Sequence, residues 1–293
     1  MLKRTRSFLV LVMLLMTVTM SAQVTTATMS GKVTAQDEPI IGATIVAIHE
    51  PSGTRYGTVT NVSGQFNLQG MRTGGPYKVE ISYVGYQTAI YKGINLLLGE
   101  NYVLNVSLKE SSELLDEVVV TASKESNMKS DRAGAIMNAN RDMISNTPTI
   151  SRSISDIMRL SPQGADVGNG FAVGGGNYRQ SFVTVDGAAF NNTFGLGGNL
   201  PANGSPISLD ALEQVTVAVT PFDVRQSGFT GGAINAVTRS GDNQFRGTAY
   251  MYFNNENLKG SKVDDYELLR SKAQYYTYGA SFGGPIIKDK LFF

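Results

Sequence analysis

Residues 212–219, LEQVTVAV, and residues 231–241, GGAINAVTRSG, decide the fold in the middle of this 293-residue chain. The second stretch continues as a strand through Ile234, Ala236 and Arg239. Three glycines lie at or just before its start and permit close backbone packing because they carry no side chain: Gly228, Gly231 and Gly232. The stretch therefore predicts a small, tightly packed sheet.

A short helix is expected upstream, in SRSISDIMRLSP at residues 151–162. The spacing of the apolar residues predicts an amphipathic helix over Ser151–Leu160. Ser153 with Asp156 has the pattern of a capping box, and Pro162 prevents the helix from continuing.

Between the helix and the sheet lies the glycine-rich stretch FAVGGGNYRQSFVTVDG at residues 171–187. Strands are expected only at Phe171–Val173 and Ser181–Asp186, and Asp186-Gly187 predicts a tight turn. Gly174-Gly175-Gly176 could cradle a phosphate, but no Gly-Lys-Ser/Thr and no helix start follow it. The sequence therefore disfavours nucleotide binding.

The first part of the chain, residues 30–109, predicts an antiparallel β-sandwich. Seven short β-rich runs alternate with turn residues. They are Ser30–Ala35, Ala43–His49, Thr54–Asn61, Gln65–Gln69, Tyr77–Tyr83, Tyr86–Tyr91 and Tyr102–Leu108. Val79, Ile81 and Tyr83 share one face, opposite Lys78, Glu80 and Ser82, as in a half-buried strand. His49, the single histidine, has no second ligand nearby and is expected to be structural or solvated.

This first unit resembles the carboxypeptidase-regulatory, transthyretin-like domain. The resemblance depends on Ser63-Gly64 before Phe66, Gly75 before Tyr77, and Val84-Gly85-Tyr86 after the next strand. It implies a small accessory sandwich without catalytic residues.

The N-terminus has the pattern of an export signal. Lys3, Arg4 and Arg6 precede an unbroken apolar run from Phe8 to Met16, and small residues offer cleavage after Ala22. The alternative, a membrane anchor, would need roughly 20 apolar residues. We therefore expect residues 1–22 to be removed on export.

A polar linker at residues 110–129 contains one β-prone hexamer. Its residues are Glu117, Val118, Val119, Val120, Thr121 and Ala122, and three consecutive valines favour extended backbone. One interpretation is an eighth strand of the sandwich. The other is a tethered, unpaired strand that a partner protein binds by strand addition.

From Phe245 onward the chain becomes rich in aromatic residues. Two runs, 245–253 and 275–282, alternate between an apolar and a more polar face and are separated by a charged segment at residues 256–272. This pattern is typical of transmembrane β-barrel strands. The alternative is an ordinary soluble hairpin with a tyrosine-rich face.

The middle of the chain resembles the plug domain of TonB-dependent outer-membrane receptors. The resemblance depends on four motifs in this order: SRSISDIMRLSP, FAVGGGNYRQSFVTVDG, LEQVTVAV and GGAINAVTRSG. DEVVVTA at residues 116–122 is similar to the TonB box of the same receptors. The resemblance implies a mainly β chain divided into signal peptide (1–22), transthyretin-like seven-strand sandwich (23–109), linker with TonB box (110–129), α+β plug (130–244) and first strands of an incomplete transmembrane barrel (245–293). The box would bind a TonB-type energy-transducing protein, the sandwich would be periplasmic, and the plug would gate an unknown ligand. A plugged barrel has about 22 strands, so we expect the N-terminal part of a longer receptor. TASKESN departs from the Gly and Lys-Arg pattern of the glycan importers, whereas TPFDVRQSGFTGGAINAVTRSG followed by YGASFGGPIIKDKLFF resembles the Oar-like branch.

Composition excludes several other classes. The absence of cysteine rules out disulfides and thiolate sites, and one histidine disfavours an imidazole-ligated metal or a Ser-His dyad. The near balance of 25 Lys and Arg against 24 Asp and Glu gives no basic surface for nucleic acid. We therefore expect no enzyme activity and no cofactor. The rival to the receptor is a secreted adhesion or carbohydrate-binding sandwich protein.

Overall fold

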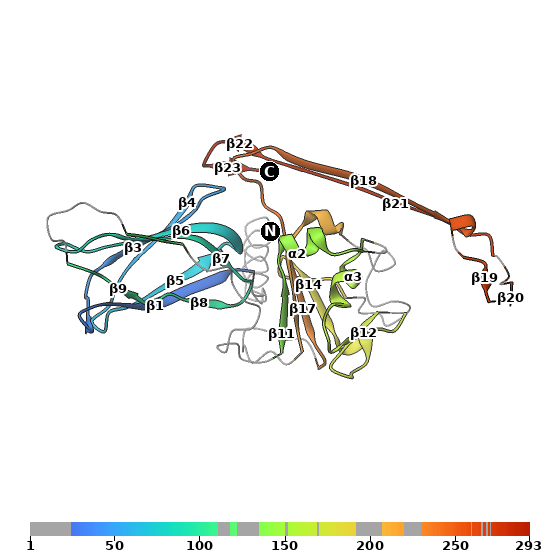
Figure 1. Cartoon of the computed structure of the whole chain (residues 1–293), viewed down its shortest axis with the longest axis horizontal. Coiled ribbons are helices and arrows are strands. Elements are labelled where there is room, and N and C mark those ends of the chain that lie inside the picture. The colour runs from blue at the N-terminus through green and yellow to red at the C-terminus, as the bar shows by residue number, and fades with distance from the viewer. Residues whose placement is uncertain are drawn as a thin grey trace, which may run out of the picture.

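The computed structural model describes residues 25–110, 118–121, 135–149, 152–168, 170–191, 207–219, 230–258, 260–264, 266–267, 269 and 271–293. The fold is mainly β, as expected, and has three parts: a β-sandwich, a middle unit with one mixed sheet and short helices, and a long projecting hairpin (Figure 1). The predicted signal at residues 1–22 lies outside the described residues.

Two five-stranded sheets form the sandwich. In the first, β1 (Ala27–Ala35) pairs antiparallel with β2 (Glu38–Pro39) and β5 (Gln65–Met71), and parallel with β8 (Asn101–Val103) and β9 (Val106–Ser107). The second has the order β10-β7-β6-β3-β4 and comprises β3 (Thr44–His49), β4 (Thr54–Val59), β6 (Gly74–Ser82), β7 (Ala89–Leu96) and β10 (Val118–Thr121).

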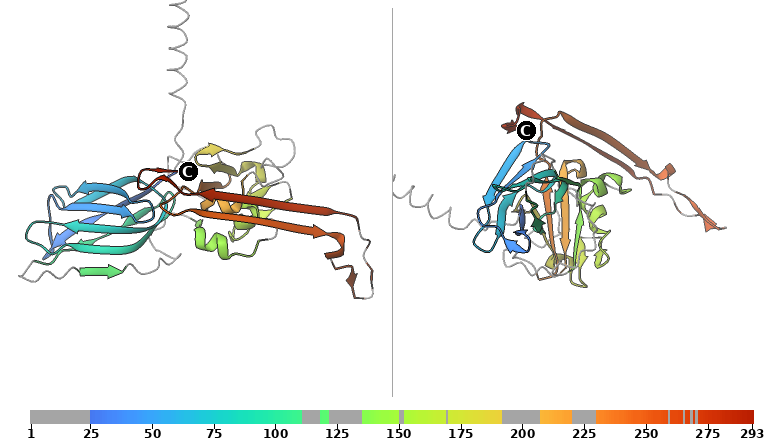
Figure 2. Two further views of the ribbon diagram at one scale, coloured as in Figure 1. Left: turned by 90° about the horizontal axis from the view of Figure 1, so that it is seen from above. Right: turned by 60° about the vertical axis from the view of Figure 1, so that its left-hand side comes forward.

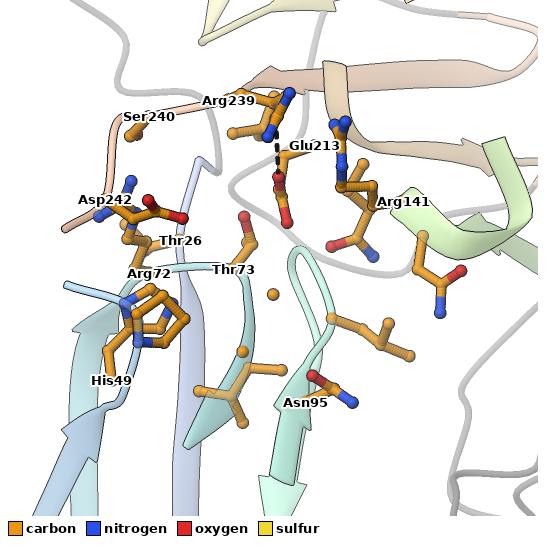
Figure 3. A pocket seen from close by; sticks show the side chains of 18 of the residues that line it. Thr26, His49, Arg72, Thr73, Asn95, Arg141, Glu213, Arg239, Ser240 and Asp242 are labelled. Atoms are coloured by element: carbon orange, nitrogen blue, oxygen red, sulfur yellow. Dashed lines mark ion pairs between the residues drawn. The ribbon is translucent and has the colours of Figure 1, made fainter. Parts of the chain in front are cut away.

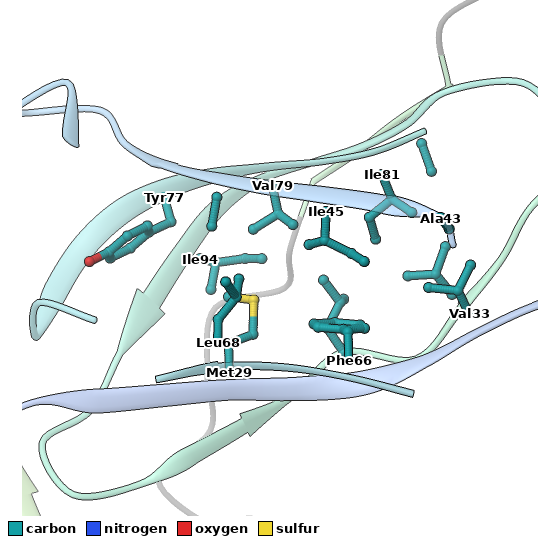
Figure 4. Packing of buried hydrophobic residues seen from close by; sticks show 14 of the residues in the cluster. Met29, Val33, Ala43, Ile45, Phe66, Leu68, Tyr77, Val79, Ile81 and Ile94 are labelled. Atoms are coloured by element: carbon teal, nitrogen blue, oxygen red, sulfur yellow. The ribbon is translucent and has the colours of Figure 1, made fainter. Parts of the chain in front are cut away.

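The sandwich core lies between the two sheets (Figure 4). Met29 and Phe66 from the first sheet face Ile45 and Ile81 from the second, and all four are at most 4% exposed. Alternation along β6 buries Val79 and Ile81 while Lys78 and Glu80 form an ion pair on the opposite face. Burial of each large apolar side chain contributes about 1.5–3 kcal/mol. The half-buried pattern predicted for this strand is confirmed, except that Tyr83 lies beyond its end and is exposed.

The predicted sandwich strands differ from the observed ones mainly toward the C-terminal end of the unit. The run expected at Tyr86–Tyr91 begins three residues later, because Tyr86 instead forms an isolated bridge with Glu110. The strand expected at Tyr102–Leu108 is divided into β8 and β9. The turn at Ser63-Gly64 is confirmed, with Gly64 at a φ of 72°.

The middle unit contains a sheet of order β11-β16-β17-β14-β15. Its strands are β11 (Ile136–Ala139), β14 (Phe182–Val185), β15 (Ala188–Ala189), β16 (Leu212–Ala218) and β17 (Ala233–Thr238). β12 (Gly164–Asp166) and β13 (Phe171–Val173) form a separate pair. The two strands expected upstream of the GGAINAVTRSG stretch therefore both form, and the second is shorter than predicted.

Short helices cover one face of this sheet (Figure 1). The helices are α2 (Arg141–Asn146), α3 (Ile154–Met158) and the single turns η1 (Tyr178–Gln180) and η3 (Leu209–Ala211). α3 is the helix predicted from the sequence, although shorter, and it has the Ser153–Asp156 capping box. Ile154 and Ile157 pack against Val215 and Val217 of β16, so this face holds the core of the unit.

Glycines determine two local features of the middle unit. Asp186 and Gly187 both have positive φ, 49° and 80°, and form the predicted tight turn between β14 and β15. A Cβ on Gly232 would lie 2.5 Å from Cγ1 of Val173, so the close backbone approach predicted for this position is confirmed.

The opposite face of the same sheet carries a row of buried polar side chains. Asn138, Thr216, Asn235 and Thr184 are register neighbours across four strands. Thr216 donates to Asn138, and Thr184 donates to Asn235 over 2.7 Å. All four side chains are at most 6% exposed, so hydrogen bonding within the row offsets the cost of burying them.

The C-terminal hairpin pairs β18 (Arg246–Asn255) with β21 (Gln274–Gly283) in a continuous ten-residue register. It projects beyond the middle unit, and smaller elements follow at its two ends: η4 (Glu256–Leu258), β19 (Lys262–Val263), β20 (Tyr266–Glu267), β22 (Pro285–Ile287) and β23 (Leu291–Phe292) (Figures 1 and 2). Both faces of the strands are largely exposed, including Met251 at 69% on one face and Tyr275 at 59% on the other. The two predicted alternating runs are confirmed as strands, and their large side chains have no core of their own.

Candidate functional site

The predicted partner-binding strand is found on the sandwich. Val118–Thr121 forms β10, which pairs in parallel with β7: Val118 opposes Ala89 and Thr121 opposes Lys92. Figure 2 (left) shows it as the green arrow alongside the sandwich. The described residues of the hexamer therefore form an additional strand of the sandwich, and the expectation that they would be unpaired is wrong. Without this pairing β7 would expose a row of backbone N–H and C=O groups, which a valine-rich strand is well suited to cover. Glu117 and Ala122 lie outside the described residues.

A second candidate site is a cavity of about 940 Å³ between the sandwich and the middle unit (Figure 3). The sandwich turn at Arg72 and the end of β7 at Asn95 line one side, and residues of α2, β16 and the segment after β17 line the other. Eight charged side chains contribute to the lining: Arg72, Arg141, Arg239, Arg246, Asp142, Asp186, Glu213 and Asp242. Cations and anions are equal in number among these side chains.

Glu213 is a half-buried carboxylate in the lining of this cavity. Its Oε2 lies 4.0 Å from Nε of Arg239, and Arg141 lies nearby in Figure 3. Burial raises the pKa of Glu213, while the positive charges of Arg141, Arg239, Arg72 and Arg246 oppose that rise. The arginines therefore reduce, without cancelling, the rise in the pKa of Glu213 that burial causes.

His49 lies at the sandwich side of the cavity and is 5% exposed. Its Nδ1 is 2.6 Å from Oγ of Ser52, and its ring packs against Tyr77 at a centroid distance of 5.0 Å. Burial and, secondarily, the charge of Arg72 lower the pKa of His49 to about 4, with a smaller opposing effect of Asp242. Ser52 is fully buried, so this His–Ser contact has no room for a substrate. The imidazole is structural, one of the two roles expected for it.

Direct hydrogen bonds connect the sandwich with the rest of the chain around the cavity. A guanidinium N–H of Arg72 donates to the carbonyl of Gly241 over 3.1 Å, and the backbone N–H of Asn243 donates to the carbonyl of Pro51 over 3.0 Å. The N–H of Leu98, just after β7, donates to Oε1 of Gln214 on β16 over 3.1 Å. The segment that follows β7 is therefore in contact with strand β16 of the middle unit.

Sequence reasoning missed the charged cavity and its contacts. A usable signal was present in LEQVTVAV, where Glu213, Gln214 and Thr216 interrupt an otherwise apolar strand. Polar residues in alternation on a buried strand indicate a face that contacts something other than an apolar core. Neither a group of metal-ligating side chains nor a helix long and apolar enough to cross a membrane is found among the residues that the structure describes.

Two known domain families match this chain, one toward each end. Residues 28–109 match the carboxypeptidase regulatory-like domain, and residues 237–293 match an outer membrane beta barrel domain. The sandwich family expected from the sequence is therefore confirmed.

Two characterised relatives are similar over longer stretches. The chain is homologous to the TonB-dependent transporter Oar of Myxococcus xanthus, with 31% identity over 150 residues, and to the TonB-dependent receptor SusC of Bacteroides thetaiotaomicron, with 29% identity over 269 residues. These alignments cover 49% and 87% of this chain but only 14% and 24% of the two relatives. Among solved structures, the siderophore receptor PirA from Acinetobacter baumannii matches 53% of this chain and 23% of its own, with a TM-score of 0.41 and 20% identity.

Proposed function

We propose that the chain is part of an outer-membrane TonB-dependent receptor, in which the middle unit gates the passage of a ligand through a β-barrel. The observation that carries this proposal is the β18–β21 hairpin, whose family match is to an outer membrane beta barrel domain. Each of its strands has ten residues, a length that suits a tilted transmembrane strand. Exposure of large apolar and aromatic side chains on both faces suits strands with lipid on one side and other protein on the other.

The proposed division of the chain follows the sequence expectation. Residues 1–22 are an export signal, 23–109 a periplasmic accessory sandwich, 110–129 a linker with the TonB box, 130–244 a plug and 245–293 the first barrel strands. Support for the plug comes from one mixed sheet, short helices and described glycine-rich connections such as Gly174-Gly175-Gly176. Such connections open at low local free energy, which suits a unit that must rearrange to open a path.

The proposed handle for the energy-transducing partner is Glu117–Ala122. The described part of this segment, β10, is already extended, as strand addition requires. Several backbone hydrogen bonds loaded together along a strand also resist force better than a single side-chain contact.

The handle is tested by replacing Val119 with Pro in the full gene product. Proline removes a backbone donor and disrupts strand pairing, so binding of the periplasmic domain of the host's TonB-type protein should be lost. Val119→Thr, which keeps a β-branched side chain and the N–H, is the matched control and should bind normally. Circular dichroism should be the same for both variants, and unchanged affinity of Val119→Pro would refute the assigned handle.

The rival, a secreted adhesion or carbohydrate-binding protein, accounts for the sandwich but gives the exposed hairpin no role. Fractionation of cells that express the full gene product distinguishes the receptor from the secreted protein. The receptor should be recovered with the outer membrane and should need detergent for extraction, whereas the adhesion protein should be soluble after cell lysis or secreted.

A further inference from the structure

Strand β10 is the last strand of its sheet. Its one neighbour in the order β10-β7-β6-β3-β4 is β7, and no strand within the described ranges pairs with its other edge. The register runs from Val118 opposite Ala89 to Thr121 opposite Lys92. The sandwich therefore ends, on this side, in the segment that we propose as the partner's binding site.

Pairing with β7 leaves half of the backbone groups of β10 available. In a strand, the N–H and C=O of one residue point to one edge, and those of the next residue point to the other. The groups that bind β7 therefore belong to alternate residues, and the intervening residues direct theirs outward. An incoming strand would use a different set of atoms from β7, so the two do not compete for the same hydrogen bonds.

The docked strand is also preorganised. Fixing each backbone residue in an extended conformation costs conformational entropy, and in β10 the pairing with β7 has already fixed four residues. A partner that meets an ordered strand edge loses less entropy on binding than one that must first order a free linker.

We propose that the sandwich presents β10 to the energy-transducing partner, whose edge strand adds to the outer edge of β10 as a sixth strand of the sheet. The sandwich then remains attached in the complex instead of being displaced. This inference rests on the proposed function of residues 117–122 and adds a role for the sandwich, which that function leaves as an accessory.

The contacts of β7 give this arrangement a mechanical consequence. Leu96 ends β7, and two residues later the N–H of Leu98 binds Gln214 on β16 of the middle unit. Asn138 on the neighbouring strand β11 donates to Glu100 in the same turn of the sandwich. Tension applied to β10 would reach β16 and β11 through the sandwich, in addition to the covalent linker.

A disulfide across the β10–β7 pair tests whether the two strands must separate. Residues 1–293 contain no cysteine, so Thr121→Cys with Lys92→Cys introduces the one cysteine pair in this part of the gene product. Paired strands lie about 4.8 Å apart, which fits the Cα separation of a disulfide. The full gene product is purified in detergent, the cross-link is verified by mass spectrometry, and binding of the periplasmic domain of the host's TonB-type protein is measured in the oxidised and reduced forms.

If the partner binds β10 while β10 stays paired with β7, the oxidised variant should bind the partner with an affinity within about twofold of that of its reduced form. A tenfold or larger loss on oxidation, reversed by reductant, would show that β7 must be displaced and would overturn the inference while leaving the handle intact. Failure of the cross-link to form would also overturn it, because the register would be wrong. The single variants Thr121→Cys and Lys92→Cys should not respond to oxidation. If the reduced double variant and the natural protein both fail to bind, the proposed handle itself is refuted.

Discussion

Protonation of His49 should destabilise the sandwich in a defined pH range. The imidazole is 5% exposed, and its pKa is lowered from 6.5 to about 4, chiefly by burial. Between these two pH values the unfolded chain binds a proton that the folded chain does not, so stability falls as the pH falls. The full decrease in the free energy of unfolding, reached below pH 4, is about 3 kcal/mol, and the decrease at pH 5.5 is about 1.4 kcal/mol. Above pH 6.5 the effect vanishes.

The chain's single histidine makes this measurement unambiguous. One ¹³C-labelled histidine gives one ring signal, whose titration by NMR reports the pKa of His49 in the folded protein. Amide hydrogen exchange of β3 gives the free energy of opening of the sandwich, which should decrease as the pH is lowered from 6.5 to 4 after correction for the intrinsic exchange rate. In His49→Gln that decrease should be smaller by the amounts given above. A measured pKa of 6 or higher, or equal pH dependence in the two proteins, would refute the reasoning from burial.

Two further substitutions test close contacts. Gly232→Ala places a Cβ against Val173 and should destabilise β13 and β17 by about 1–3 kcal/mol, measured by hydrogen exchange. The double variant with Val173→Ala should lose less stability than the sum of the two single variants. Strict additivity of the two losses would contradict the contact. Arg72→Ala removes the hydrogen bond to the Gly241 carbonyl and a positive charge near His49. It should raise the pKa of His49 in the same titration and speed amide hydrogen exchange at Asn243. An unchanged pKa of His49 would contradict the assigned role of Arg72.

Local features of the fold could be predicted from the sequence because short-range chemistry determines them. The Ser153 capping box, the turn at Asp186-Gly187 and the strand at Phe171–Val173 each depend on residues within a few positions of one another. The alternating aromatic runs after Phe245 predicted the two strands of the hairpin for the same reason.

Features that depend on contacts distant in sequence were harder to predict. The pairing of Val118–Thr121 with Ala89–Lys92 joins segments almost thirty positions apart, and a parallel pair has no hairpin turn to announce it. Helix α2 has only six residues and depends on the Asn140 side chain, which caps it by accepting from the N–H of Met143. The charged cavity combines turns of the sandwich with strand ends of the middle unit, and no single stretch of sequence contains that arrangement.

The connection from β17 to β18 limits how far the middle unit could travel. β17 ends at Thr238 and β18 begins at Arg246, so seven residues join the mixed sheet to the hairpin. Even pulled straight, that tether would reach only about 25 Å, less than the thickness of a hydrocarbon bilayer core. In the receptor proposed above, where the hairpin would be part of the barrel, the whole sheet could not leave the barrel. A passage would then have to open by partial unfolding of the middle unit or by a small shift at one side of it.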